Sequence, residues 1–285
     1  MPQVQNTDWI GNMSLNVVLL GYGAIGKSLH QMLEAHPGRI NVLGVVGRNS
    51  ASDDHVLAQT RQTSTGLSVL GLNQALEGAD IIAECASPAA VTELGPRIIT
   101  SGTDLLVASL GALVDEQVRS NIMDAGPGRA YLSTGAIGGL DLIRAAGDTI
   151  KAITLRTSKH PYGLLHPGLD EATRDSITEV VELGDSRIVF EGTVADAVTL
   201  FPSNINVAAA LGLAAGNFDL VRVRIVADPS AELTRHTIAV RGSGGSYDFD
   251  IQNIPDPHNP ATSVLTARSM ASGLLRLAGV GPHFI

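Results

Sequence analysis

Cysteine is almost absent from this chain of 285 residues, in which Cys85 is the single one. One cysteine can form no internal disulfide bond and no thiolate metal cluster. Because Cys85 ends an apolar run, we expect it to be a small buried residue and not a nucleophile. The histidines show no metal-ligand spacing such as HExxH, so the sequence predicts no metal site.

Charged residues and long apolar runs are scarce as well. Only 16% of the residues are charged and 44% are hydrophobic, which is typical of a well-buried globular chain without a disordered tract. No window approaches the ~18 uninterrupted apolar residues of a membrane span, and the polar start has no signal-peptide pattern. The net charge of −9 disfavours nucleic-acid binding, which needs Lys and Arg to neutralise phosphates. We therefore expect a cytoplasmic protein with neither a membrane nor a nucleic-acid partner.

A glycine-rich turn lies near the N-terminus, within VVLLGYGAIGKSLHQMLEAHPG, residues 17–38. An apolar strand pattern leads into Gly21, Gly23 and Gly26, and a helical pattern follows. Glycines at these offsets let the chain reverse, let backbone N–H groups approach a pyrophosphate, and let the helix pack on the strand. The motif predicts a dinucleotide site that also includes Ala24 and Ile25; the alternative is a structural turn that binds nothing.

The expected fold class is α/β, because strand and helix patterns alternate through the first half of the chain. This alternation is typical of a doubly wound parallel sheet with crossover helices. From about Lys151 the chain becomes strand-rich, with one apolar helix at SNINVAAALGLAAG. The sequence thus predicts an N-terminal Rossmann domain over residues 14–135 and a second, α+β domain over residues 136–259.

A last helix, at about residues 260–285, is expected to complete the first domain. Asn259 would be its N-cap and Pro260 its first helical residue. Its apolar stripe would consist of Val264, Leu265, Met270 and Leu274.

An acidic residue is missing at the tip of the second strand, which reads Val46-Gly47-Arg48-Asn49-Ser50. In an NAD-specific fold, an Asp or Glu ~20 residues beyond the glycines binds the ribose hydroxyls. Arg48 is suited to pair with a 2′-phosphate instead. The alternatives are that Arg48 is a solvated surface residue, or that Asp53 or Asp54 binds the ribose. We expect NAD or NADP as the cofactor, with NADP or dual use preferred.

Four further motifs lie along the chain: TGAIGGLDLIRAA (134–146), FEGTVADAVTLFPSNINVAAALGLA (190–214), VADPSAELTRHTIAV (226–240) and HNPATSVLTARS (258–269). Together they resemble the L-aspartate dehydrogenase family, and the resemblance spans nearly the whole chain from Asn16. It implies NAD(P)-dependent oxidative deamination of L-aspartate to iminoaspartate, which hydrolyses to oxaloacetate and ammonia. It also implies a homodimer whose contact is provided by the second domain.

The resemblance implies that His236 is the catalytic histidine and that Ala136 and Asn206 bind the cofactor. Histidine suits general acid/base work near neutral pH, where the substrate's amino nitrogen must lose a proton. A small Ala136 would leave room for a nicotinamide ring, and Asn206 offers both a donor and an acceptor. The alternatives are a helix-entry turn at Ala136 and a helix cap at Asn206.

Three more residues complete the predicted site. Ser87 follows a parallel strand at its carboxyl end, where ligands enter such sheets, and is a candidate cofactor contact. Lys159 is a candidate for a substrate carboxylate, although the family more often has Arg-Lys-Pro where this chain has Ser158-Lys159-His160-Pro161. Asn204, close to Asn206, is the other candidate for the substrate.

Two different readings stay open from the sequence. One is a related two-domain reductase, of the homoserine dehydrogenase or dihydrodipicolinate reductase type. The other is a regulatory protein that binds NADP and catalyses nothing.

Overall fold

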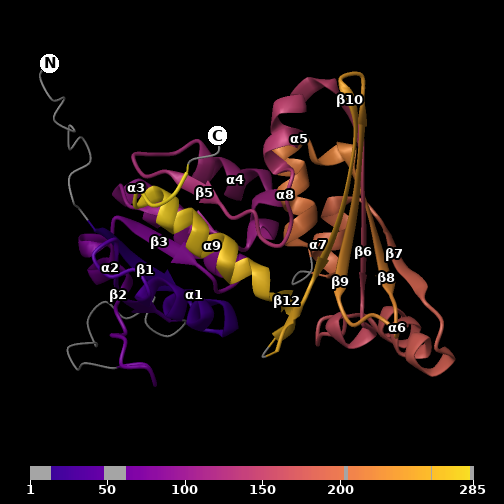
Figure 1. The fold of residues 1–285 in the computed structure, drawn as a ribbon, viewed down its shortest axis with the longest axis horizontal. Helices are drawn as coiled ribbons and strands as arrows, with labels where there is room; N and C mark the ends of the chain where they lie inside the picture. Colours follow the sequence, from indigo (N-terminus) through magenta and orange to yellow (C-terminus); the bar gives the residue numbers. More distant parts are fainter. Residues whose placement is uncertain (1–13, 48–61, 202–204, 258, 283–285) are drawn as a thin grey trace, which may run out of the picture.

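The computed structural model describes residues 14–47, 62–201, 205–257 and 259–282. Two five-stranded sheets organise this part of the chain. In Figure 1 the N-terminal sheet lies on the left and the second sheet is seen edge-on at the right, with helices between them. Within the described residues, no helix has the length and apolar character needed to cross a membrane.

The first sheet is parallel throughout and has the strand order β2-β1-β3-β4-β5. Val17 to Leu20 of β1 are all buried, as expected for a strand covered on both faces. The predicted doubly wound Rossmann fold is thereby confirmed. Its elements are β1 (Leu15–Leu20), α1 (Ala24–Glu34), β2 (Ile40–Val46), α2 (Leu72–Gly78), β3 (Ile81–Glu84), α3 (Pro88–Ser101), β4 (Asp104–Val107), η1 (Leu110–Val114), α4 (Glu116–Met123) and β5 (Ala130–Leu132).

The second sheet is mixed, with the order β10-β9-β6-β8-β7, and only β6 and β8 pair in parallel. Together with its helices it gives the predicted second α+β unit. Its elements are α5 (Leu140–Ala146), η2 (Gly147–Thr149), β6 (Ile150–Lys159), η3 (Pro161–Gly163), α6 (Glu171–Leu183), β7 (Arg187–Gly192), α7 (Val194–Leu200), α8 (Asn206–Ala215), η4 (Phe218–Leu220), β8 (Val221–Ala227), β9 (Thr234–Gly242) and β10 (Gly245–Asn253).

Alternation along β6 and β9 decides which side chains face the interior. Four side chains on one face are buried: Ile153 and Leu155 of β6, and Ile238 and Val240 of β9. Arg241 of β9, which points to the other face, is exposed. The buried face packs against α8, whose Ala208 to Gly212 are themselves buried. Figure 1 shows α5, α7 and α8 on this face of the sheet. Any polar residue in phase with these apolar positions therefore points inward.

The sequence reading missed α6 and α7, since it expected a single helix in this region. Polar residues dominate α6, and only Ile177 and Val180 are buried, so its apolar stripe is narrow. The start of α7 does carry a helix-start pattern, because Thr193 and Asp196 form a capping box. The side chain of each residue accepts a hydrogen bond from the backbone N–H of the other.

The predicted start of the last helix was wrong. Asn259 and Pro260 belong to β12 (Asn259–Ser263), which pairs with β11 (Pro255–Asp256). The helix α9 (Val264–Leu277) begins four residues later than expected, with Ser263 as N-cap: its Oγ accepts a hydrogen bond of 3.0 Å from the Leu265 N–H. Leu265 is 39% exposed and lies outside the buried stripe.

The position of α9 returns the end of the chain to the first sheet. Met270 and Leu274 are fully buried in the same apolar cluster as Leu29 and Leu33 of α1. Figure 1 shows α9, in yellow, crossing in front of the parallel sheet.

Candidate functional site

The glycine turn has the geometry that a pyrophosphate requires. Gly21 has φ +96°, and a Cβ there would lie 2.7 Å from the Cβ of Ala86. A Cβ on Gly26 would lie 2.5 Å from the carbonyl oxygen of Gly21, so the helix packs directly on the turn. At Gly23 the space is open, with no described atom within 4 Å of a Cβ position. The turn therefore fits a dinucleotide whose phosphates approach over Gly23.

The N-terminus of α1 adds to this fit. Its N-cap is Gly23, and no side chain of the described structure caps the first turn. The first N–H groups of the helix, which include those of Ala24 and Ile25, point out of the turn toward the space over Gly23. A negatively charged group is favoured there by these N–H groups and by the partial positive charge of the helix end.

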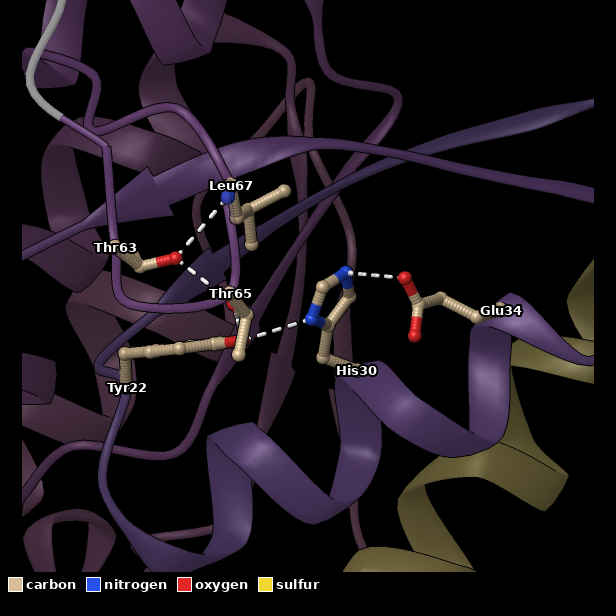
Figure 2. Close-up of polar contacts among 6 residues, drawn as sticks. All are labelled: Tyr22, His30, Glu34, Thr63, Thr65 and Leu67. Atoms are coloured by element: carbon tan, nitrogen blue, oxygen red, sulfur yellow. Dashed lines mark hydrogen bonds and ion pairs between the residues drawn. The ribbon is translucent and has the colours of Figure 1, made fainter.

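Tyr22, between the glycines, fastens the turn to a distant segment of the chain. Its hydroxyl lies 2.8 Å from His30 Nδ1 of α1 and 2.6 Å from Thr65 Oγ1. Thr63 continues the network by bonding to Thr65 and by accepting the Leu67 N–H, as Figure 2 shows. His30 Nε2 is also 3.6 Å from Glu34 one turn further along α1. The sequence reading gave no role to any of these side chains.

A cavity lies where the carboxyl ends of β3, β4 and β5 face the second sheet. The ends of β6 and β9, the start of α8 and the junction of β12 with α9 complete its wall. The cavity brings together five of the residues singled out from the sequence, which are far apart along the chain: Ile25, Ala136, Lys159, Asn206 and His236. Ligands of open parallel sheets enter at this edge, and Ile25, directly after Gly23 and Ala24, places the cavity next to the glycine turn.

His236 reaches the cavity from β9. It is directly opposite Thr157 of β6 in the sheet, and its Nδ1 lies 3.0 Å from Thr157 Oγ1. With Nδ1 engaged, Nε2 is the ring nitrogen left for a ligand. Burial and, secondarily, the charge of Lys159 lower the pKa of His236 to about 4. The imidazole is therefore neutral at pH 7 and able to accept a proton.

Lys159 reaches the same cavity from the end of β6, two residues beyond Thr157 and on the same face. Its side chain is 5% exposed, and burial lowers its pKa to about 8. At pH 7 the ammonium group is still mainly charged. The cavity thus holds a neutral imidazole beside a cation, an arrangement suited to an anionic ligand that must lose a proton.

Asn206 and Ala136 hold the wall through hydrogen bonds between remote segments. Asn206 is the first residue of α8 and does not cap it; its Oδ1 accepts the Gly111 N–H of η1 at 3.0 Å. Ala136 is 7% exposed, and its carbonyl oxygen accepts a hydrogen bond of 2.7 Å from Asn253 Nδ2. The Gly111–Asn206 bond ties the first unit to the second, and the Asn253–Ala136 bond holds Ala136 against the end of β10.

Apart from Gly21, Gly23, Ala24 and Gly26 of the glycine turn, three predicted site residues are not among the residues that line the cavity. Ser87 is the N-cap of α3, where its Oγ accepts the Ala90 N–H at 3.2 Å. Arg48 and Asn204 lie outside the described residues. Cys85 does line the cavity as a buried residue, and burial raises the pKa of its thiol, so it remains uncharged.

Several polar residues of the site were missed from the sequence. The sequence pattern does indicate Thr157, because it lies two residues before Lys159 on β6 and faces the same side of the sheet. Glu84 was also readable, as a single acid at the end of the apolar run Ile81–Glu84. Ser109, Ser133, Thr234 and Thr266 also contribute to the wall, but their sequence contexts carry no distinguishing pattern.

A parallel sheet with an open glycine turn, and a cavity at its carboxyl edge that a second sheet closes with an imidazole and a lysine, define a two-domain oxidoreductase that uses a nicotinamide cofactor. Two family models match the chain accordingly: "Aspartate dehydrogenase, C-terminal" over residues 141–277 and "Homoserine dehydrogenase, NAD binding domain" over residues 21–128. The chain belongs to the L-aspartate dehydrogenase family, as its similarity to whole proteins establishes.

Two relatives illustrate that similarity. The L-aspartate dehydrogenase of Thermotoga sp. (strain RQ2) is 34% identical, over 92% of this chain and 97% of that protein. The L-aspartate dehydrogenase of Methanococcoides burtonii is 32% identical, over 93% of this chain and 97% of that protein. In both cases the match runs through both sheets.

Solved structures agree. The crystal structure of aspartate dehydrogenase from Thermotoga maritima superimposes with a TM-score of 0.66 at 31% identity, covering 96% of this chain and 99% of that one. Homoserine dehydrogenase of S. aureus has a TM-score of 0.50 at 16% identity, covering 95% of this chain and 80% of that one. The second likeness shows a shared fold only.

Proposed function

We propose that this protein oxidises L-aspartate at Cα with NAD or NADP, giving iminoaspartate, which water converts to oxaloacetate and ammonia. The observation that carries the proposal is the cavity that joins His236 and Lys159 to the carboxyl edge of the parallel sheet. Membership of the L-aspartate dehydrogenase family supports the choice of substrate. A bound nicotinamide would supply the hydride acceptor.

His236 is proposed to act as the general base that accepts a proton from the substrate's α-ammonium group. The α-ammonium group of aspartate must become an amine before hydride can leave Cα, because the nitrogen lone pair forms the C=N bond. A neutral imidazole with its proton on Nδ1, donated to Thr157 Oγ1, presents the Nε2 lone pair to that ammonium group. The lowered pKa of His236 keeps this form available near pH 7. Once that proton has passed to solvent, the same nitrogen can accept a proton from the water that hydrolyses the imine.

Lys159 is proposed to bind a substrate carboxylate. A buried ammonium group in a cavity gains a strong charge-assisted hydrogen bond when a carboxylate enters. The arrival of that negative charge also opposes the effect of Lys159 on His236 and makes the imidazole a better base. Asn204, outside the described residues, is proposed as a second substrate contact.

The cofactor is proposed to run from the glycine turn to the cavity. Gly21, Gly23 and Gly26, with Ala24 and Ile25, would hold the pyrophosphate. Ala136 and Asn206 would border the nicotinamide end, and Ser87, at the edge between the two, is a further proposed contact. Support comes from the open space at Gly23 and from the cavity wall that Ala136 and Asn206 build.

The proposed division of labour assigns residues 14–135 with α9 to the cofactor and residues 136–259 to the substrate and to a homodimer contact. The packing of Met270 and Leu274 on α1 supports placing α9 with the first unit. Light scattering of the purified protein would test the dimer.

The substrate is tested by following nicotinamide reduction with L-aspartate and, as controls, D-aspartate, L-glutamate and L-homoserine. We expect kcat/KM for L-aspartate to exceed that for L-glutamate by at least ~100-fold, since an extra methylene moves the distal carboxylate away from fixed partners. Equal rates with L-glutamate, or turnover of L-homoserine alone, would overturn the proposal. Cofactor binding without turnover of any amino acid would favour a regulatory protein.

The cofactor preference is tested at Arg48. If Arg48 pairs with a 2′-phosphate, Arg48→Ala weakens NADP binding by about 10- to 150-fold and hardly changes NAD binding. Gly47→Asp should shift the preference toward NAD, because a carboxylate pairs with free ribose hydroxyls and repels a phosphate. Equal effects of Arg48→Ala on both cofactors would make Arg48 an ordinary surface residue.

A further inference from the structure

A buried carboxylate that the proposed mechanism does not use lies at the centre of the parallel sheet. Glu84 is the last residue of β3, between Leu20 of β1 and Val107 of β4, and it is 0% exposed. The strand order reverses between β1 and β3, since β2 lies on one side of β1 and β3 lies on the other. Ligands of doubly wound sheets bind in the crevice outside this position.

Four hydrogen bonds hold the carboxylate, and all of their donors belong to the two loops that follow β3 and β4. Oε1 accepts the Ala86 N–H at 2.8 Å and the Ser109 hydroxyl at 2.8 Å. Oε2 accepts the N–H groups of Ala108 at 3.0 Å and Ser109 at 2.9 Å. Ala86, Ala108 and Ser109 all line the cavity. Glu84 is therefore hydrogen-bonded directly to three residues that line the cavity.

The donor pattern favours the ionised form of Glu84. Three of its partners are backbone N–H groups, which cannot accept a proton from a carboxylic acid, and only the Ser109 hydroxyl can turn around. Burial raises the pKa of this carboxyl above its usual value, and the hydrogen bonds from Ser109, Ala86 and Ala108 offset that rise only in part. The four donors are neutral, so they orient the negative charge without cancelling it.

The loop that Glu84 holds is also bonded to Asn206. Ser109 precedes η1, and the Gly111 N–H of η1 donates to Asn206 Oδ1 at 3.0 Å. A shift of the loop at residues 108–109 would therefore move the residue proposed to border the nicotinamide. Glu84 fixes this loop from one side while Asn206 fixes it from the other.

We propose that Glu84 is a positioning residue for the nicotinamide end of the cofactor, and that its negative charge favours the oxidised over the reduced cofactor. The inference rests on the proposed use of a nicotinamide cofactor but not on the identity of the amino-acid substrate. The oxidised ring carries a positive charge and the reduced ring is neutral, so a fixed negative charge behind the wall distinguishes them electrostatically. Lys159, on the opposite wall, acts in the other direction, and it stays constant when Glu84 is changed.

The test compares Glu84→Gln with Ser109→Ala by equilibrium binding in the absence of aspartate. Glu84→Gln removes the charge but keeps the shape: its amide oxygen can accept from Ala108 and Ser109, and its NH₂ group can donate to the Ser109 hydroxyl, while the Ala86 N–H loses its acceptor. Ser109→Ala keeps the charge and removes one hydrogen bond of the wall. The probes are NADP⁺ and NADPH, with NAD⁺ and NADH measured in parallel.

We expect Glu84→Gln to weaken binding of the oxidised cofactor about tenfold more than binding of the reduced cofactor, because only the positively charged ring is attracted by the lost charge. Ser109→Ala should weaken both redox forms alike. An equal effect of Glu84→Gln on the two forms would overturn the proposal, because a purely structural role changes both together.

A measurement on the wild-type protein keeps the test decisive if Glu84→Gln does not fold. The unmodified protein should bind the oxidised cofactor at least as tightly as the reduced one. Tighter binding of the reduced form by about tenfold or more, a difference of ~1.4 kcal/mol, would contradict the proposed charge effect. Failure to oxidise L-aspartate would overturn the proposed substrate and leave this binding ratio intact, so the two failures are distinguishable.

Discussion

The proposed site has two walls, the glycine turn with the edge of the parallel sheet and the side chains of the second sheet, and the two are built on different principles. The glycine turn acts through backbone atoms and empty space: the open position at Gly23 and the close contact at Gly26 lie within six consecutive residues. The opposite wall acts through side chains from different strands, and the pair Thr157 and His236 is separated by 79 positions. Binding geometry is thus encoded locally, whereas the proposed chemistry depends on the pairing of β6 with β9. Substitutions should reveal this difference by affecting either cofactor affinity or turnover.

The largest effect on substrate KM is expected for Lys159→Met. Loss of a charge-assisted hydrogen bond to a substrate carboxylate should raise KM for L-aspartate by about 10- to 150-fold, with cofactor affinity unchanged. Steady-state kinetics with both substrates varied would measure this separation. Unchanged KM would remove Lys159 from substrate binding.

The same variant should be more stable than the wild type at pH 7. A shift of the Lys159 pKa from 10.5 to about 8 means that the folded state disfavours the ammonium form by at most ~3 kcal/mol. Between pH 8 and 10.5 the unfolded wild-type chain binds more protons than the folded one, so wild-type stability rises with pH. Lys159→Met lacks this rise, and urea unfolding at pH 7 and pH 10 should show the gap narrowing.

Gly23→Ala and Gly26→Ala form a matched pair on the other wall. Gly23→Ala places a methyl group in open space, so stability should be unchanged while cofactor Kd rises at least about tenfold, or ~1.4 kcal/mol. Gly26→Ala places its Cβ 2.5 Å from a backbone oxygen and should destabilise the protein without ligand by about 1–3 kcal/mol. Thermal unfolding and cofactor titration of both variants would measure this. Equal loss of stability in both would contradict the proposed roles.

Thr157→Val should lower kcat by about five- to tenfold, corresponding to one lost hydrogen bond of ~1 kcal/mol to His236 Nδ1. The control is Thr157→Ser, which retains the hydroxyl and should keep most of the activity. If the two variants were equally active, the orientation of His236 would not depend on this hydroxyl.

The smallest effect is expected for Tyr22→Phe. The change removes the hydrogen bonds to His30 and Thr65 shown in Figure 2 but keeps the ring. Stability should fall by about 1 kcal/mol, and kcat at saturating cofactor should stay near the wild-type value. A large loss of kcat would mean that the tether acts on the cavity as well as on the turn.

The sequence predicted the elements whose signals are local. The glycine turn, the parallel sheet and the two-unit plan were all confirmed, because strand, turn and helix patterns each fit within a short window. The capping box at Thr193 and Asp196 was an equally local signal for α7 and could have been used. Glu84 could also have been singled out from a local pattern, because it is the one acidic residue at the end of an apolar strand.

The errors came from pairing between segments. Asn259 and Pro260 carry good helix-start signals, but strand pairing with Pro255 and Asp256 takes precedence and delays α9 to Val264. Similarly, no local pattern indicates that Gly111 meets Asn206 or that Thr157 faces His236, since register across a sheet fixes these contacts. Arg48 and Asn204 stay predictions, because they lie outside the described residues.

The central claim is that one wall binds the cofactor and the other moves the proton, and His236→Gln tests it most directly. Cofactor Kd should be measured by titration, and hydride transfer in a single turnover with saturating L-aspartate, for this variant beside Gly23→Ala. We expect His236→Gln to slow hydride transfer at least ~100-fold with cofactor Kd within about twofold of wild type. Gly23→Ala should show the reverse, a weaker Kd with a near-normal transfer rate at saturation. A near-normal transfer rate in His236→Gln, with the protein folded and the cofactor bound, would contradict the account.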